Sequence, residues 1–272
     1  MKKVEADLLK ILGKTPRTKQ SPELSAISYS GNTVAVLVKR EFWVMESETQ
    51  RVICTGDFEK KRGSTIYKHA NADGKERKLQ HPLPPKFSMR GFDCCALSDD
   101  FIAIGSDSKI MMVSVRGQYA GRWLAFDDIK DAVVKKLTFS PDGLELVALL
   151  SVDDEESPYD GARIYSTANF LPKNVHEGEI DVIGSEVLNP SSLRWTSDFV
   201  HDPNKITFSR DRTMVAWCTT HCRAKAKIRI LKKERETWRY WGDHEIDVHT
   251  SDHKDWNGLA ATGISLYIPS KK

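Results

Sequence analysis

The chain has 272 residues, of which 40% are hydrophobic and 29% charged, and its formal net charge at pH 7 is +3. These values are ordinary for a globular protein and exclude wholesale disorder, and no apolar run approaches the ~18 residues of a membrane-spanning helix. Five unevenly spaced cysteines and no secretory signal indicate a reducing compartment, so we expect a soluble protein of the cytosol or nucleus.

The first 20 residues form a basic segment with an amphipathic pattern. Six basic residues stand against two acidic ones, for a local net charge of +4. Four apolar residues recur at helical spacing before Gly13, which predicts a short helix whose apolar side covers an open surface of the domain. These residues are Val4, Leu8, Ile11 and Leu12. We therefore divide the chain into a basic amphipathic segment, residues 1–20, and a domain, residues 21–272.

Four segments of the domain share one pattern, in which a short alternating strand, a polar turn and a more apolar strand follow one another. The clearest copy reads "LTFSPDGLELVAL": Leu137 and Phe139 alternate with Thr138, and the turn runs from Ser140 to Gly143. The copies span residues 27–38, 95–106, 137–150 and 206–217. A fifth, weaker start is "ISLYIPS", residues 264–270.

The spacing of the copies predicts the architecture. The second and third copies begin 42 residues apart, at residues 95 and 137. This interval matches the ~40–45 residues of a four-stranded propeller blade, and the longer intervals fit a blade plus an insertion. Each hairpin is followed by third and fourth strands; in the third copy the expected fourth strand is "EIDVIG", residues 179–184. We predict an all-β, β-propeller-like fold with four full blades and a partial fifth that begins near Gly263. A sandwich of stacked sheets is the alternative.

The hairpins resemble the repeat of the WD40-type β-propellers, which reads φ-x-F-S-P-D-G-x-x-φ-A. The resemblance extends from about residue 26 to residue 241 and is strongest at 137–150 and 206–217. No copy has the Trp-Asp or Gly-His dipeptide that this family often carries. The resemblance implies a divergent WD40-like scaffold, a non-catalytic module that binds other proteins and needs no cofactor.

Two groups of residues are the candidate interaction sites. Residues 57–90 hold nine basic and four acidic residues and lack strand alternation, which predicts a long basic loop between the first two blades. Its candidate contacts with phosphate or an acidic partner are Lys60, Lys61, Arg62, Lys75, Arg77 and Lys78. The second group lies in "TWRYWG" and consists of Trp238, Tyr240 and Trp241. Aromatic residues of this kind form binding hot spots when exposed, and packing between blades is the alternative.

We expect neither a metal site nor a catalytic residue. Cys218, His221 and Cys222 lack a second ligand pair at similar spacing, and the acidic residues 153–160 lack the calcium-loop pattern. The sequence has no nucleophile elbow and no glycine-rich phosphate loop. The alternative functions are a propeller enzyme with a loop-built site at the mouth of the channel, or RNA or phosphoinositide binding through residues 1–20 and 57–90.

The last copy of the repeat contains one strand, so we expect an open or imperfectly closed ring. An open ring would expose apolar side chains near Ile27 and Tyr29 or near Ile264 and Leu266. Unpaired edges and exposed apolar surface of this kind recruit partners, so self-association is a further expectation.

Overall fold

The structure is a computed structural model. It describes residues 24–38, 41–59, 64–70, 76–82, 92–116, 122–126, 129, 132–152, 159–170, 182–184, 191–196, 203–221 and 225–247. At residues 57–59, 64–70 and 76–82, and at several strand ends, the description is of the backbone only. The expected N-terminal helix and the expected fifth start near Gly263 lie outside the described residues.

Four sheets, here called blades, make up the described chain, and each contains four antiparallel strands in meander order. The first blade is β1 (Leu24–Ile27), β2 (Thr33–Val38), β3 (Glu41–Glu46) and β4 (Val52–Glu59). The second is β7 (Cys94–Leu97), β8 (Phe101–Ser106), β9 (Lys109–Ser114) and β10 (Arg122–Ala125). The third is β11 (Ala132–Phe139), β12 (Glu145–Val152), β13 (Tyr159–Ser166) and β15 (Ser191–Thr196), with the 3-10 helix η1 (Thr167–Phe170) after β13. The fourth is β16 (Pro203–Phe208), β17 (Met214–His221), β18 (Lys225–Glu234) and β19 (Thr237–Asp247). In this part of the chain, no helix is long and apolar enough to cross a membrane.

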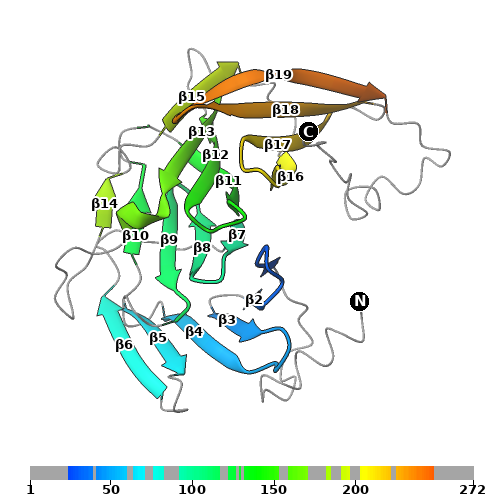
Figure 1. The fold of residues 1–272 in the computed structure, drawn as a ribbon. Coiled ribbons are helices and arrows are strands. Elements are labelled where there is room, and N and C mark those ends of the chain that lie inside the picture. The colour runs from blue at the N-terminus through cyan, green and yellow to red at the C-terminus, as the bar shows by residue number, and fades with distance from the viewer. Residues whose placement is uncertain are drawn as a thin grey trace, which may run out of the picture.

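The blades are arranged as in a propeller. Their first strands, β1, β7, β11 and β16, contact one another in that order, and the remaining strands of each blade extend outward (Figure 1). The fourth blade lies at the top of Figure 1, the third and second follow below it, and the first lies at the bottom. The predicted all-β, propeller-like fold, its four blades and the positions of its hairpins are confirmed.

Three hydrophobic cores made of described residues join the blades, and each core lies between two consecutive blades. Between the first and second blades, Leu37 and Phe42 pack with Leu97 and Ile102. Between the second and third, Met112 and Leu124 pack with Leu137 and Tyr165. Between the third and fourth, Val147 and Leu149 pack with Trp217 and Trp238. Successive side chains of a strand point to opposite faces, so β12 gives Leu146 and Ala148 to one core and Val147 and Leu149 to the next. Burial on both faces explains why β12 is continuously apolar.

The insertion after the first blade differs from the expected loop. Much of residues 57–90 is strand: β5 (Ser64–Ala70) pairs with β4, and β6 (Glu76–Pro82) pairs with β5, both antiparallel. The loop prediction is wrong for these residues, because it took the lack of alternating apolar residues to exclude a strand. A hairpin added to the edge of a sheet satisfies its backbone groups through the ladder of hydrogen bonds and does not need a buried face.

The fourth strand of the third blade also differs from the expectation. Residues 191–196, strand β15, pair with β13, whereas β14 (Val182–Gly184) pairs in parallel with β10 of the second blade. The proposed strand at residues 179–184 is therefore wrong as part of the third blade. The insertion after η1 instead reaches the outer edge of the neighbouring blade.

Candidate interaction surface

A buried serine forms the base of the turn between the first two strands of every blade. These residues are Ser28, Ser98, Ser140 and Ser209, each 2–7% exposed. In each turn the serine N–H donates to the carbonyl of the residue opposite, at 2.8–3.0 Å, and the serine hydroxyl accepts the N–H of that same residue, at 2.9–3.2 Å. The repeat in the sequence is therefore a repeat of one pair of serine hydrogen bonds, which closes a shorter turn in the second blade than in the other three.

Two of these turns have an aspartate that completes them. Ser140 donates to Asp142 Oδ1 at 2.6 Å, and Ser209 donates to Asp211 Oδ1 at 2.6 Å. In the first blade Ser30 takes the place of the aspartate, because its hydroxyl accepts the N–H of Asn32 at 3.0 Å and lies 3.0 Å from the Ser28 hydroxyl. The sequence allows residues 27–38 to be aligned with residues 137–150 through either Ser28 or Ser30, and these contacts decide between the two. The counterpart of Ser140 is Ser28.

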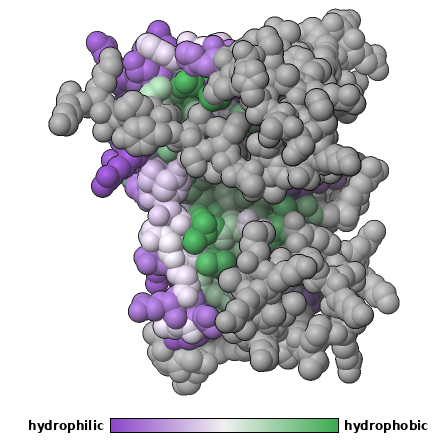
Figure 2. Space-filling view, turned by 90° about the vertical axis from the view of Figure 1, so that its right-hand side faces the viewer, coloured by the Kyte–Doolittle hydropathy of each residue, from purple (hydrophilic) through white to green (hydrophobic). Residues whose placement is uncertain are grey.

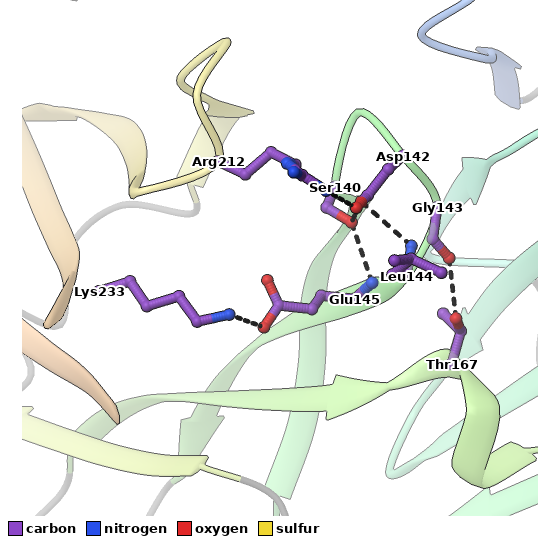
Figure 3. A network of polar contacts seen from close by, with 8 residues as sticks. All are labelled: Ser140, Asp142, Gly143, Leu144, Glu145, Thr167, Arg212 and Lys233. Carbon is purple, nitrogen blue, oxygen red and sulfur yellow. Dashed lines mark hydrogen bonds and ion pairs between the residues drawn. The ribbon is translucent and has the colours of Figure 1, made fainter. Parts of the chain in front are cut away.

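Polar contacts at these turns join the blades. The Ser30 hydroxyl donates to Asp99 of the second blade at 2.7 Å. Arg212 of the fourth blade forms an ion pair with Asp142 of the third, and Figure 3 shows this pair beside the bond between Lys233 and Glu145, which is 2.9 Å long. The turns therefore hold neighbouring blades at the ends of their inner strands.

Tyr29 connects the first blade with the fourth. Its hydroxyl accepts the N–H of Phe208 at 3.1 Å and lies 3.0 Å from the Thr207 hydroxyl. Tyr29 is nevertheless 47% exposed, and Ile27 is 63% exposed. The exposed apolar side chains expected near Ile27 and Tyr29 are confirmed, whereas Ile264 and Leu266 lie outside the described residues.

The carboxyl groups of Asp142 and Asp211 both have a pKa below its ordinary value. Partial burial raises the pKa of Asp142, but hydrogen bonds from Ser140, the N–H of Leu144 and Arg212 outweigh that effect. The pKa of Asp211 is lowered chiefly by the hydrogen bond from Ser209. Both shifts arise from the structure of the turns.

We expect acid to weaken the turn of the third blade. A carboxyl with a lowered pKa in the folded protein adds stability above its ordinary pKa of 3.8, and this stability is lost as the pH falls through the folded value. Asp142→Asn keeps the Oδ1 acceptor but removes the charge. The variant should be less stable than the parent at pH 7, and the difference should shrink towards pH 3. Urea unfolding at pH 7 and pH 3 measures the difference in free energy of unfolding between variant and parent. A difference that is equal at the two pH values contradicts the prediction. The control is Asp100→Asn, because the Asp100 side chain is 72% exposed.

The outer edge strand of the fourth blade, β19, carries an exposed aromatic pair. Tyr240 is 41% exposed and Trp241 is 55% exposed. The strand has a bulge at this point: Leu231 pairs with Tyr240 and Ile230 with Gly242, so Trp241 has no partner residue on β18. A bulge of this kind interrupts the strict alternation of the strand and redirects side chains.

Contacts with the rest of the blade fix both rings. The Tyr240 hydroxyl donates to Asp243, and burial, with Asp243 as the second cause, raises the pKa of Tyr240 to about 12. Asp243 in turn lies 3.3 Å from the guanidinium of buried Arg229, which reaches Asp160 of the third blade at 3.4 Å. The Lys232 ammonium lies 4.0 Å from the centre of the Trp241 ring. The aromatic pair is therefore held in place by its own blade and, through Arg229, by the blade before it.

The structure separates the three aromatic candidates. Trp238 is 3% exposed, packs edge-on against Phe208 and donates its indole N–H to Glu145 at 3.3 Å, so it belongs to the core between the third and fourth blades. Tyr240 and Trp241 are the exposed members. Of the basic candidates, Arg77 and Lys78 lie on β6, where the backbone alone is described. Lys60, Lys61, Arg62 and Lys75 lie outside the described residues.

Sequence reasoning missed two buried arginines that connect blades. Arg163 places its guanidinium carbon 5.7 Å from the centre of the Phe126 ring of the second blade, and Arg229 pairs with Asp160 of the third. Both sit at the same place in the third strand of their blade: Arg163 is opposite Ala148 and Arg229 is opposite Trp217. The signal was present, because "ARIY" and "IRIL" each place one arginine inside an apolar run.

Three thiols have strongly raised pKa values, those of buried Cys54 and Cys94 and of partly buried Cys95. Burial disfavours the thiolate and raises the pKa of Cys54, Cys94 and Cys95 to about 12, so these residues stay protonated at neutral pH. Cys218 and His221 lie on β17, and Cys222 lies outside the described residues. Within the described part of the chain, no group of three or more His, Cys, Asp or Glu residues could hold a metal ion.

Comparisons with known proteins assign the chain to no family. No protein-family model matches the chain, and no curated protein matches it. The fold is that of a β-propeller. One similar solved structure is the Nup133 β-propeller domain of Vanderwaltozyma polyspora, with 11% identity over 85% of this chain and 76% of that chain and a TM-score of 0.39. A second is Hsv2p of Kluyveromyces lactis, with 12% identity over 84% of this chain and 74% of that chain and a TM-score of 0.45. A third is a Bacteroides uniformis protein provisionally named a 6-phosphogluconolactonase, with 14% identity over 85% of this chain and 75% of that chain and a TM-score of 0.42. At these identities and TM-scores the similarity says nothing about activity or partners.

Proposed function

We propose that the chain is a non-catalytic protein-interaction module, and that Tyr240 and Trp241 form the centre of its binding surface. The observation that carries this proposal is the exposure of two large aromatic residues at consecutive positions of a bulged edge strand. Trp and Tyr dominate the hot spots of protein interfaces, because they bury a large area and also offer a polar group. These two rings are already restrained, by Lys232 and Asp243, so a partner would lose little side-chain entropy in binding them.

The position of β19 in the assembly supports the same surface. The outer edge of the first blade is extended by β5 and β6, that of the second is covered by β14, and β15 of the third contacts β19. Among the described strands, none pairs with the outer side of β19. Its bulge and its charged residues limit indiscriminate pairing with other strands, which favours recognition through side chains.

Quantitative affinity capture tests the proposal. The tagged full chain is compared with the Tyr240→Ala/Trp241→Ala variant in a nuclease-treated lysate of the native cell. The matched control is Val133→Ala/Leu144→Ala, which removes two other exposed apolar side chains, 36% and 60% exposed. A hot spot is worth ~2 kcal/mol or more, so proteins bound through β19 should fall ~30-fold with the first variant and stay bound by the control.

Two results would contradict this function. Proteins captured equally by the parent and the Tyr240→Ala/Trp241→Ala variant would rule out the aromatic pair as the binding centre. Salt-sensitive binding of RNA or of phosphoinositide vesicles, in the absence of a protein ligand, would instead favour the basic segments 1–20 and 57–90. Near-UV circular dichroism of all three proteins verifies that the variants fold.

A further inference from the structure

The four blades follow one another in an arc, so the first and the fourth blade each have one face without a neighbouring described blade. In the second, third and fourth blades, the residue before the buried serine packs towards the preceding blade and is 2–5% exposed; these residues are Leu97, Phe139 and Phe208. Their counterpart in the first blade, Ile27, is 63% exposed. The described sheets share three cores, whereas a closed ring of four would have four. Hydrophobic residues gather on the side of the molecule that Figure 2 shows, the right-hand side of Figure 1.

The far face of the fourth blade is buried although no described blade follows it. On β17, Val215 and Trp217 belong to the core with the third blade, so Ala216 and Cys218 point to the opposite face. Ile228 is the cross-strand partner of Cys218 and shares that face. Ala216, Cys218 and Ile228 are 0%, 3% and 6% exposed, and none of the three cores contains them. These exposures hold within a single chain, so a segment of the same chain is their natural cover.

We propose that residues 264–268 pack on this face as the inner strand of a fifth sheet, with Ile264, Leu266 and Ile268 against Ala216, Cys218 and Ile228. The segment "ISLYI" has the alternation of a strand with one apolar face, which the blade face requires. Each blade of this chain lies on the far face of the blade before it, and the next strand in the sequence would continue that order.

The connection is long enough for this placement. Six residues lead from the outer strand of one blade to the inner strand of the next at both β10–β11 and β15–β16. Sixteen residues, 248–263, separate the end of β19 from Ile264. At ~3.3 Å per residue they can span ~50 Å, whereas the return from the fourth to the first strand of a blade crosses three spacings of ~4.8 Å.

The thiol of Cys218 reports whether this face is covered. In the full chain, Leu266→Asp/Ile268→Asp places two charges on the apolar side of the segment, and Ser265→Asp/Tyr267→Asp places two on the other side. Maleimide labelling followed by peptide mass spectrometry gives a rate for each cysteine. We expect the first variant to label Cys218 ~10-fold faster or more than the parent, and the second to label it at the parental rate. Cys54 and Cys94 lie in other cores and should stay unlabelled in every protein.

Three outcomes would overturn the proposal. Equal protection of Cys218 in both tail variants would show that residues 264–268 do not cover it. Exposure of Cys218 by Leu8→Asp/Ile11→Asp would assign the cover to the N-terminal segment, and protection that disappears on dilution would assign it to a second copy of the chain. If Cys54 and Cys94 also react, the variant is unfolded, and a Leu266→Cys/Cys222→Ser protein is tested instead. Under mild copper-phenanthroline oxidation, its new thiol should form a disulfide with Cys218. Failure to form this disulfide counts against the proposal.

Discussion

Replacing Trp217 with alanine is expected to lower the free energy of unfolding by about 3–5 kcal/mol. Trp217 is the largest of the fully buried side chains and lies at the centre of the core between the third and fourth blades. The loss combines the transfer energy of the indole ring with the cavity left among Val147, Leu149 and Trp238. Since a typical domain is stable by about 5–15 kcal/mol, this is a large fraction of the total.

Trp241→Ala is the matched control, because it makes the same chemical change in the same blade at a side chain that is 55% exposed. It should cost no more than ~1 kcal/mol, mostly through the lost contact with Lys232. Urea unfolding followed by circular dichroism measures both variants. Hydrogen exchange should locate the effect of Trp217→Ala in the third and fourth blades; equal costs for the two substitutions would show that the core is placed incorrectly.

Gly56→Ala is expected to destabilise the first blade by about 1–3 kcal/mol. Gly56 on β4 is paired with Phe42 on β3, and a Cβ atom at Gly56 would overlap a carbon of the Phe42 ring. Phe42 is fully buried in the core between the first and second blades, so the ring cannot move aside without disturbing that core. The glycine is required by the close approach of the ring.

A double-mutant cycle with Phe42→Leu tests this cause. Leucine removes part of the ring that covers Gly56, so Gly56→Ala should cost less in the Phe42→Leu background than in the parent. Thermal unfolding of the four proteins gives the coupling energy, which for residues in contact is typically about 0.5–3 kcal/mol. Strict additivity would mean that the two residues do not clash.

The inner hairpins could be predicted from the sequence because their signal is local. Alternating apolar residues, a serine and turn-forming residues such as Asp142 and Gly143 occur within a few positions, and each has a direct effect on the backbone. The register of the first blade could not be decided in this way. Ser28 and Ser30 are two residues apart, and a shift of two leaves every side chain of a strand on the same face, so the pattern fits both alignments.

Contacts between distant parts of the chain account for the other differences. Strands β14 and β10 pair through three residues each, although more than 50 positions separate them in the sequence. A segment as short as "VIG" does not indicate which strand it pairs with. Strict alternation would place Tyr240 on the same face as buried Trp238, yet Tyr240 is exposed next to a bulge at Trp241, and the sequence "TWRYWG" does not reveal that bulge. The reach of Tyr29 to Phe208 exists because the arc brings the first and fourth blades together at their inner ends.

Strand β14 fastens the rims of the second and third blades. It belongs to the chain segment between β13 and β15 of the third blade, yet its backbone pairs with β10 at the periphery of the second. A bending motion that spreads these two blades would have to break that pairing far from the core, where the displacement is largest. In the described sheets, β5 and β6 pair within the first blade and do not reach the second. We therefore expect the second and third blades to move as one body more readily than the first and second, which no described strand pairs at their rims.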